Sequence, residues 1–213
     1  EWPDVVPTYV QNVKKNTNKT MKSTRVLEIE YNELQKAIKD GKHEYHCFYL
    51  ATINKKAPKI RTVVLRALNK NKNTLSFHTD LRSDKVKEIE SNRNVSALFY
   101  DKKRRIQIRI QGNAQLDENS NRLKKIWSSM RPESKLCYMG PFAPGEKLDQ
   151  FQPNLPNHDA QNITTKNNKK GYENFCRVTI CLESLDWLQL EHSGHLRMYF
   201  SFNKNSKPVW IAS

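Results

Sequence analysis

Residues 61–85, RTVVLRALNKNKNTLSFHTDLRSDK, determine how the rest of the chain is interpreted. Two short runs rich in β-branched and aromatic residues, 59–68 and 74–79, are separated by a polar Asn/Lys stretch. This pattern predicts two antiparallel strands joined by a turn. Ser83 then stands in the capping position of a predicted helix over 83–92. Arginines and lysines cluster at the ends of these elements, so the stretch predicts a packed unit that faces an anion.

The strand pattern continues on both sides of this stretch. Further strands are predicted at 46–53, 94–100, 104–112, 174–182, 185–191, 195–202 and 208–212. Two further helices are predicted over 24–41 and 118–130. The sequence therefore predicts a mainly β fold with a few helices (α+β), built as a barrel-like antiparallel sheet.

A single domain fits this order better than two, because strands precede and follow the most polar segment of the chain. That segment, 149–172, is rich in Asn, Lys and Pro and is predicted to be a poorly ordered insertion. Residues 1–23 are predicted to form an N-terminal arm, and 24–213 the domain.

The charge balance favours anionic partners. The 213 residues include 37 Lys plus Arg and 22 Asp plus Glu, a formal charge of +15 at pH 7. Such a surplus suits nucleic acid, an acidic membrane or phosphorylated small molecules, although dispersed lysines also form ordinary solvated surfaces. The four cysteines lack the C-x-x-C spacing of a zinc site, and three of them sit among apolar neighbours, so buried, reduced thiols are expected. No apolar stretch is long enough to cross a bilayer and the N-terminus is unlike a signal peptide, so we expect a cytoplasmic protein without a membrane partner.

Several common catalytic motifs do not occur in the sequence. It contains no G-x-S-x-G, no P-loop and no G-x-G-x-x-G, which argues against the usual hydrolase, kinase and Rossmann dehydrogenase sites. Histidines three residues apart occur twice, but on a strand this spacing puts side chains on opposite faces. No metal site is predicted.

The strand over 59–68 carries an arginine on each of its faces. Alternation places Arg61 with Val63 and Leu65, and Arg66 on the other face. An arginine beside apolar residues is costly to bury unless it meets a counter-charge.

The predicted helix at Ser83 offers a place for such a counter-charge. A hydroxyl, free backbone N–H groups and the helix dipole meet Arg82 and Lys85 in one turn. These groups can form a phosphate site, or an ordinary solvated helix start.

Trp187 and Arg197 lie ten residues apart on consecutive predicted strands, a spacing that can bring them together across a hairpin. An indole beside a guanidinium suits a flat anionic ligand, while packing of the Trp in the core is the alternative.

Five motifs together resemble the flavin-binding pattern of the pyridoxamine 5′-phosphate oxidase family, especially its less characterised oxidase-like branch. In order they are RTVVLR, FHTD, S-D-K, Q-I-R-I-Q-G, and a Trp followed ten residues later by an Arg. The resemblance spans roughly residues 45–145 and 173–202. It implies a split β-barrel homodimer with FMN in each of two clefts at the subunit interface.

The resemblance also implies site residues. The cofactor-binding positions that it implies are Arg61, Thr62, Val63, Val64, Leu65, Arg66, His78, Thr79, Ser83, Lys85, Gln107, Trp187 and Arg197, with Arg82 as a possible further charge. Arg61, Ser83 and Lys85 would hold the FMN phosphate, Gln107 the ring edge, and Trp187 and Arg197 would reach over from the partner subunit. The substrate-binding positions are Arg66, Trp127, Arg131, Lys135 and His195, and the implied catalytic residues are His195 and Arg197.

This sequence departs from the oxidase pattern at several of these positions. Asp84 replaces an arginine after the serine, Trp127 a tyrosine, Lys135 a serine and Ser193 an arginine. The resemblance as a whole still implies an FMN-dependent oxidase. We expect it to transfer a hydride from a phosphorylated amine or alcohol to FMN, with reoxidation by dioxygen. A flavin reductase or a non-catalytic flavoprotein is the first alternative, and a basic nucleic-acid-binding protein the second.

Overall fold

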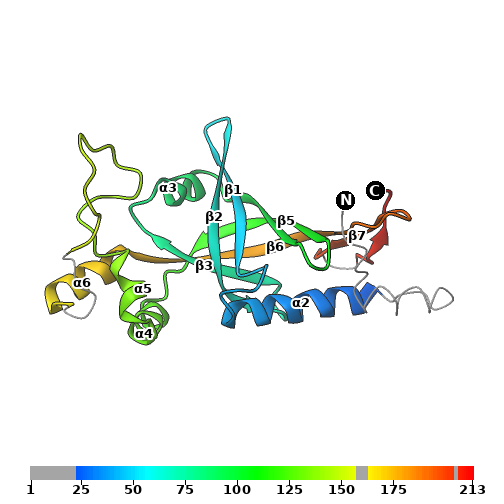
Figure 1. The fold of residues 1–213 in the computed structure, drawn as a ribbon, viewed down its shortest axis with the longest axis horizontal. Coiled ribbons are helices and arrows are strands. Elements are labelled where there is room, and N and C mark those ends of the chain that lie inside the picture. Colours follow the sequence, from blue (N-terminus) through cyan, green and yellow to red (C-terminus); the bar gives the residue numbers. More distant parts are fainter. Residues whose placement is uncertain (1–22, 157–162, 204–205) are drawn as a thin grey trace.

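A single antiparallel sheet organises the chain in the computed structural model, which describes residues 23–156, 163–203 and 206–213. Its spatial order is β3-β2-β1-β4-β5-β6-β7-β8, and β3 also pairs with β6, so that the first six strands close into a barrel. The strands are β1 Cys47–Asn54, β2 Ala57–Asn69, β3 Thr74–Asp80, β4 Asn94–Asp101, β5 Ile106–Leu116, β6 Phe175–Gln189, β7 Leu196–Ser201 and β8 Val209–Trp210. β6 is the longest strand and runs through the length of the molecule (Figure 1).

Five helices surround the barrel in the described residues. They are α2 Ser23–Lys39, α3 Asp84–Ser91, α4 Ser120–Ser129, α5 Pro132–Leu136 and α6 Thr165–Asn174. α2 packs along the barrel and contacts β2, and α3 contacts β1 and β5. α4, α5 and α6 gather at one end of the molecule, away from β7 and the C-terminus (Figure 1).

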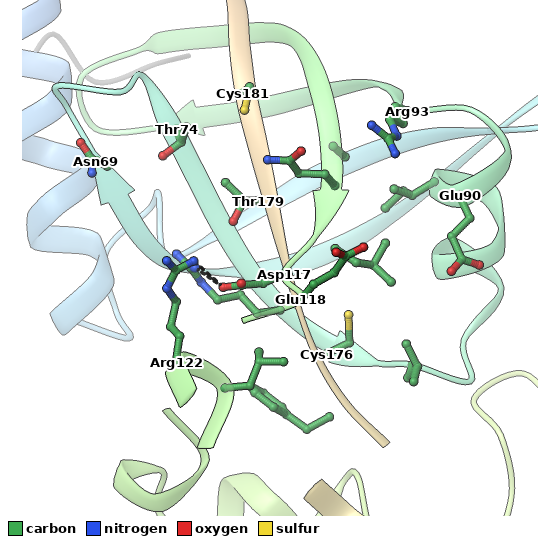
Figure 2. A pocket seen from close by; sticks show the side chains of 18 of the residues that line it. Asn69, Thr74, Glu90, Arg93, Asp117, Glu118, Arg122, Cys176, Thr179 and Cys181 are labelled. Carbon is green, nitrogen blue, oxygen red and sulfur yellow. Dashed lines mark hydrogen bonds and ion pairs between the residues drawn. The ribbon is translucent and has the colours of Figure 1, made fainter. Parts of the chain in front are cut away.

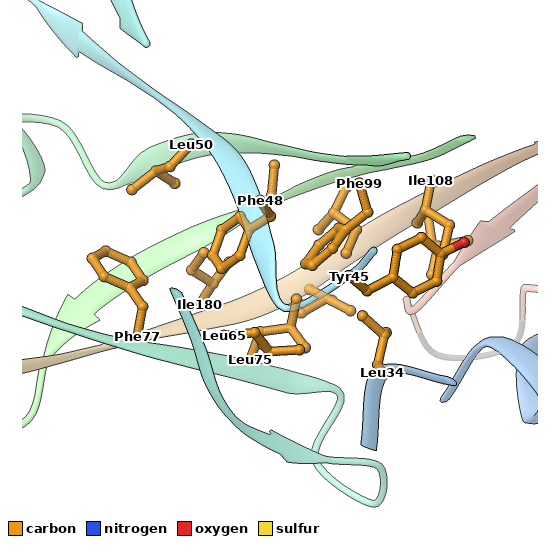
Figure 3. Close-up of a cluster of buried hydrophobic side chains, with 14 of the residues drawn as sticks. Leu34, Tyr45, Phe48, Leu50, Leu65, Leu75, Phe77, Phe99, Ile108 and Ile180 are labelled. Carbon is orange, nitrogen blue, oxygen red and sulfur yellow. The ribbon is translucent and has the colours of Figure 1, made fainter. Parts of the chain in front are cut away.

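The core fills the barrel with side chains from alternate strand positions. Phe48 stacks on Phe99 with ring centroids 4.7 Å apart and meets Phe77 edge-on at 6.2 Å. Leu34 of α2 and Tyr45 close this cluster on one side (Figure 3). Six strands enclose just enough volume for such packing, so the barrel interior is a core and any ligand must bind outside it.

The predicted strands are confirmed, with small shifts at their ends. The two strands predicted at 174–182 and 185–191 form one continuous strand, β6. β5 begins at Ile106 because Arg105 has a φ of 57° and turns the chain before it.

The predicted helices are also found, as α2, α3 and α4, but α5 and α6 were not predicted. The prediction of a poorly ordered segment over 149–172 is wrong for its end, because α6 begins at Thr165 after a cap in which Thr164 accepts from the Asn167 amide at 3.2 Å. Few apolar residues mark this helix, whose buried contact is made by Gly171. The arm predicted over 1–23 lies outside the described residues up to position 22, and so do residues 157–162.

The cysteines are free, as expected, but burial was predicted too broadly: Cys176 is buried, Cys181 partly buried, and Cys47 and Cys137 are exposed. In the described part of the chain, no helix combines the length and apolarity required to cross a membrane.

Candidate functional site

β2 presents the first group of predicted site residues on alternate faces, as its sequence requires. Val63 and Leu65 point into the barrel and are buried, whereas Thr62 and Arg66 are exposed on the outside. Val64 is partly exposed. The predicted division of this strand between its two faces is confirmed, so Val63 and Leu65 cannot line a ligand cleft.

Arg61 lies near the start of the inward face, where β1, β2 and α3 meet. Its guanidinium pairs with the carboxylate of Glu88, with 2.8 Å between Nη2 and Oε2, and donates to the hydroxyl of Thr52. Burial alone would raise the pKa of Glu88, but the bonds from Thr52, Arg61 and Asn54 lower it on balance. The counter-charge that sequence reasoning required for Arg61 is therefore Glu88, a residue that it did not identify.

The turn from β3 into α3 brings two hydroxyls and a lysine together. Ser83 occupies the N-cap position, but its Oγ donates to the carbonyl of Asp80 at 2.7 Å and does not cap the helix. Thr79 Oγ1 lies 3.2 Å from Ser83 Oγ and accepts from Lys85 Nζ at 3.1 Å. Burial and the positive charge of Arg61 lower the pKa of Lys85.

Arg61, Thr79, Ser83 and Lys85 together form what we call the cationic cluster. Two cations, two hydroxyls and the start of an eight-residue helix are the donor set that a phosphate monoester requires. The residues present therefore fit a phosphate-bearing group such as FMN.

Arg82 was predicted to supply the positive charge that the oxidase pattern has at the position of Asp84. In the structure its guanidinium binds Asp80 and Gly140. Its Nε and Nη2 donate to Asp80 at 3.0 and 2.7 Å, and its Nη1 donates to the carbonyl of Gly140 at 3.0 Å. These bonds hold the β3–α3 turn against the segment after α5. Asp84 itself is exposed and lies 3.8 Å from Lys87.

Trp187 does not lie beside Arg197, contrary to the prediction. Trp187 is fully buried in the barrel, and its indole N–H donates to Oε1 of Glu30 at 3.2 Å. The register pairs Trp187 with Met198 and Leu188 with Arg197, so the two predicted residues lie on opposite faces of the sheet. Trp187 lies opposite the residue eleven positions later in this hairpin, whereas Arg197 is only ten positions later.

Arg197 instead pairs with a carboxylate on the outer face. Its Nε and Nη2 donate to Asp186 at 3.0 and 2.7 Å, and Asp186 also accepts from Arg109. Both arginines lower the pKa of Asp186. Gln107 lies in the same row, because Gln107 pairs with Leu188 and Leu188 with Arg197. Two strand spacings put the Gln107 and Arg197 backbones about 10 Å apart on one face.

His195 lies in the exposed segment between β6 and β7. Its Nδ1 accepts from the Glu191 amide at 3.1 Å. The ring is therefore oriented by its own turn.

The predicted substrate residues are only partly brought together. Trp127 is buried in a second apolar cluster, where its indole N–H donates to Asn168 at 3.1 Å. Lys135 Nζ lies 5.4 Å from the Trp127 ring centroid, a cation–π arrangement. Arg131 is exposed at the start of α5. Trp127 is therefore a core residue of the second cluster, and Lys135 lies over the face of its ring.

His78 packs against the second apolar cluster. Burial, with the charges of Arg66 and Arg177, lowers the pKa of His78 to about 3. The His78 ring meets Phe175 edge-on, with centroids 5.0 Å apart. His78 is therefore a neutral, partly buried side chain packed on Phe175.

A groove in the described structure lies elsewhere and was not predicted. It has a volume of about 1420 Å³ over the outer faces of β3, β5 and β6, and none of the predicted site residues lines it. Asp117 accepts from Arg122 at 2.9 Å and from Arg177 at 2.8 Å within it (Figure 2). The groove lining holds four cations and four carboxylates, so it offers no net positive charge to an anionic ligand.

Comparison with known proteins finds a family model that matches part of the chain. Residues 29–118 match the family model described as "Pyridoxamine 5'-phosphate oxidase, FMN-binding domain". This segment is similar to that family. The matched residues include the whole cationic cluster and Gln107, but end before Trp127, Trp187 and Arg197. The differences in residue placement at these three positions therefore lie outside the matched segment.

Relatives and solved structures agree with this family at larger distances. The chain is 27% identical over 175 residues to "Pyridoxine/pyridoxamine 5'-phosphate oxidase 2" of Arabidopsis thaliana, covering 78% of this chain and 84% of that protein. It is 39% identical over 77 residues to a pyridoxine/pyridoxamine 5'-phosphate oxidase of Leptospira biflexa, covering 36% of this chain and 35% of that protein.

Two solved structures share the fold of this domain. A pyridoxamine 5'-phosphate oxidase-related, FMN binding protein of Nostoc punctiforme aligns with a TM-score of 0.63 at 22% identity, over 86% of this chain and 94% of that one. PhzG of Burkholderia lata 383, solved with tetrahydrophenazine-1-carboxylic acid, aligns with a TM-score of 0.65 at 15% identity, over 91% and 94%.

Proposed function

We propose that the protein binds FMN and uses it to oxidise a phosphorylated amine or alcohol. The observation that carries the proposal is the cationic cluster, which offers a phosphate donor set within the segment that matches the FMN-binding family. Arg61, Ser83 and Lys85 would hold the FMN phosphate. Thr62 and Val64, on the outer face of β2, would lie along the flavin, and Gln107 would donate to its ring edge.

We further propose that two copies of the chain form the FMN cleft between them. Three tyrosines are exposed on β1, β4 and β7, where Tyr49, Tyr100 and Tyr199 are 50%, 40% and 37% exposed. In the strand register the paired Arg109 and Asp186 lie between Tyr199 and the other two. Exposed aromatic side chains on both sides of an ion pair suit a protein interface. A second copy packed there would face Arg197 towards a flavin. Analytical ultracentrifugation tests this point, and a strictly monomeric protein that binds FMN would refute the shared cleft.

Bound FMN would supply the two-electron acceptor, and dioxygen would reoxidise it. The residues of the chain would orient the reactants and balance charge. The Gln107 amide and the Arg197 guanidinium can stabilise negative charge at the ring edge. Arg66, Arg131 and Lys135 are the cations available to a substrate phosphate, and the exposed ring of His195 could take a proton from a substrate amine.

One assay tests both levels of the proposal. Purified protein is inspected for the yellow colour of a bound flavin and for FMN released on denaturation. Pyridoxamine or pyridoxine 5′-phosphate is then added in air, and pyridoxal 5′-phosphate and hydrogen peroxide are followed. Bound FMN with both products is the expected result. A colourless protein that takes up no FMN would refute the proposal.

A flavin reductase or a flavin-binding protein without oxidase turnover is the second candidate. The burial of Trp187 in the core and the Ser193 substitution favour it, because they remove two side chains that the oxidase pattern uses around flavin and substrate. Bound FMN without oxidation of either B6 phosphate would favour this candidate. The free cysteines suit a reducing compartment, and we propose the cytoplasm.

A further inference from the structure

Glu88 is a buried carboxylate that the proposed function does not use. Its side chain is 5% exposed, and it ties helix α3 to strands β1 and β2. Oε2 accepts from Arg61 and from Thr52, while Oε1 accepts from Asn54 at 3.3 Å. A carboxylate with three donors is held in a single orientation, so it can orient the groups that it binds.

The contacts of Arg61 leave part of its guanidinium available. One nitrogen donates to Thr52 and one to Glu88, both on the side of α3 and β1. A guanidinium carries five N–H donors in a rigid plane, so fixing one edge also fixes the direction of the remaining donors. The side chain of Arg61 is 23% exposed, which leaves those donors in reach of a ligand.

The positive charges of Lys85 and Arg61 repel each other. The ammonium of Lys85 is anchored on Thr79, whereas the guanidinium of Arg61 is held by Thr52 and Glu88. Without these two partners the Arg61 side chain would be free to turn away from Lys85 towards solvent. Its long side chain would then lose rotamer freedom each time an anion bound.

We propose that Glu88, with Thr52, is a positioning residue that holds Arg61 towards the phosphate position of FMN. This inference rests on the proposed FMN site. Glu88 does not touch the ligand, and its negative charge by itself opposes phosphate binding. Removal of the carboxylate therefore distinguishes two roles for Glu88. If Glu88 positions Arg61, its loss weakens the contribution of the FMN phosphate to binding affinity. If Glu88 acts only through its negative charge, its loss strengthens that contribution.

The test compares FMN with riboflavin, which lacks the phosphate. Flavin-free protein is titrated with each ligand by flavin fluorescence, and the ratio of the two dissociation constants measures the phosphate contribution. For the unchanged protein this ratio should exceed about 100, since charge-assisted hydrogen bonds to a phosphate are strong. Glu88→Ala should lower the ratio by about tenfold, equivalent to about 1.4 kcal/mol. Riboflavin affinity should change little.

Thr52→Val is the second variant, because it keeps the shape and charge of the site and removes only the hydroxyl that bonds Arg61 and Glu88. It should also lower the ratio, by about threefold or more. If Glu88→Ala does not fold, Thr52→Val alone tests whether Arg61 is positioned by these partners. Asp117→Asn is the matched control, since Asp117 is another buried carboxylate paired with arginines, in the groove of Figure 2. This control should leave the ratio unchanged.

The outcomes separate this inference from the function on which it rests. An unchanged protein without FMN affinity refutes the FMN site itself. A large ratio in the unchanged protein that stays equal or rises in folded Glu88→Ala and Thr52→Val overturns the positioning role and leaves the FMN site standing. A ratio that falls in both variants but not in Asp117→Asn supports it.

Discussion

Removal of Glu30 should destabilise the protein more than any exposed ion pair can. Glu30 lies on α2 with a side chain that is 2% exposed, and it accepts four hydrogen bonds from three residues of the barrel. Arg104 donates to both of its oxygens at 2.9 and 2.8 Å, Tyr45 donates at 3.1 Å and Trp187 at 3.2 Å. Arg104 also stacks over the Tyr45 ring at 5.2 Å. The carboxylate therefore joins α2 to Tyr45, Arg104 and Trp187.

The expected magnitude follows from what Glu30→Ala leaves behind. Removing one partner of a buried ion pair typically costs about 3–5 kcal/mol, because the other charge stays buried without compensation. Arg104 keeps its bond to Asp101, which reduces this cost, whereas Tyr45 and Trp187 lose their acceptor, which adds to it. We expect about 4 kcal/mol, a large fraction of the roughly 5–15 kcal/mol that stabilises most domains. For a chain of this length the melting temperature should fall by about 8–16 °C.

Urea unfolding followed by circular dichroism and tryptophan fluorescence measures this loss. Lys36→Ala is the control on the same helix, because its pair with Glu33 is 66% exposed on the lysine side and should contribute less than about 1 kcal/mol. A double-mutant cycle with Arg104→Met isolates the pairwise energy. If Glu30→Ala and Lys36→Ala destabilise the fold equally, the buried network does not hold α2 on the barrel and the reasoning is wrong.

Three further predictions concern the cluster, the neutral histidine and the unpredicted helix. Asp84→Arg should tighten FMN, but not riboflavin, by about threefold to tenfold, because it adds a cation at the start of α3; equal effects on both ligands would contradict this. The pKa of His78 is lowered to about 3 from 6.5, so its stabilising effect is complete above pH 6.5 and declines as the pH falls towards 3. His78→Gln should therefore flatten the loss of unfolding free energy between these pH values, and an unchanged slope would refute the assignment. Gly171→Ala should destabilise the fold by about 1–3 kcal/mol, since a Cβ there would lie 2.7 Å from Met139 and 2.9 Å from Trp127. The exposed Lys170→Ala on the same helix should change stability by less than about 0.5 kcal/mol, and a similar loss in both variants would exclude the close contact as the cause.

Local sequence patterns predicted the strands of the barrel, because the alternation of apolar and polar residues along each strand determines which side chains face the core. The alternation of Arg61, Val63 and Leu65 gave the correct inward face of β2, and the Ser83 signal gave the correct start of α3. The predictions that were wrong depended on distant partners. Trp187 and Arg197 were assigned to one side from their spacing alone, but a strand register shifted by one residue reverses the face. α6 was missed because it is stabilised by a glycine contact with Trp127, which no hydrophobic periodicity signals.

The distribution of ion pairs explains why the net charge of the chain says little about its partner. Many of the arginines that looked available for an anion already have a carboxylate: Arg82 has Asp80, and Arg197 shares Asp186 with Arg109. A paired arginine offers a ligand little net charge, so such residues contribute little to nucleic-acid binding. Arg61 is also paired, but Lys85 bonds only a hydroxyl among the contacts of the described residues, so the cationic cluster together with Glu88 keeps a net positive charge of one. A single excess cation with well-placed donors suits one phosphate monoester, whereas a polymer requires a row of such cations. This local balance, more than the total of +15, favours a small phosphorylated cofactor over nucleic acid.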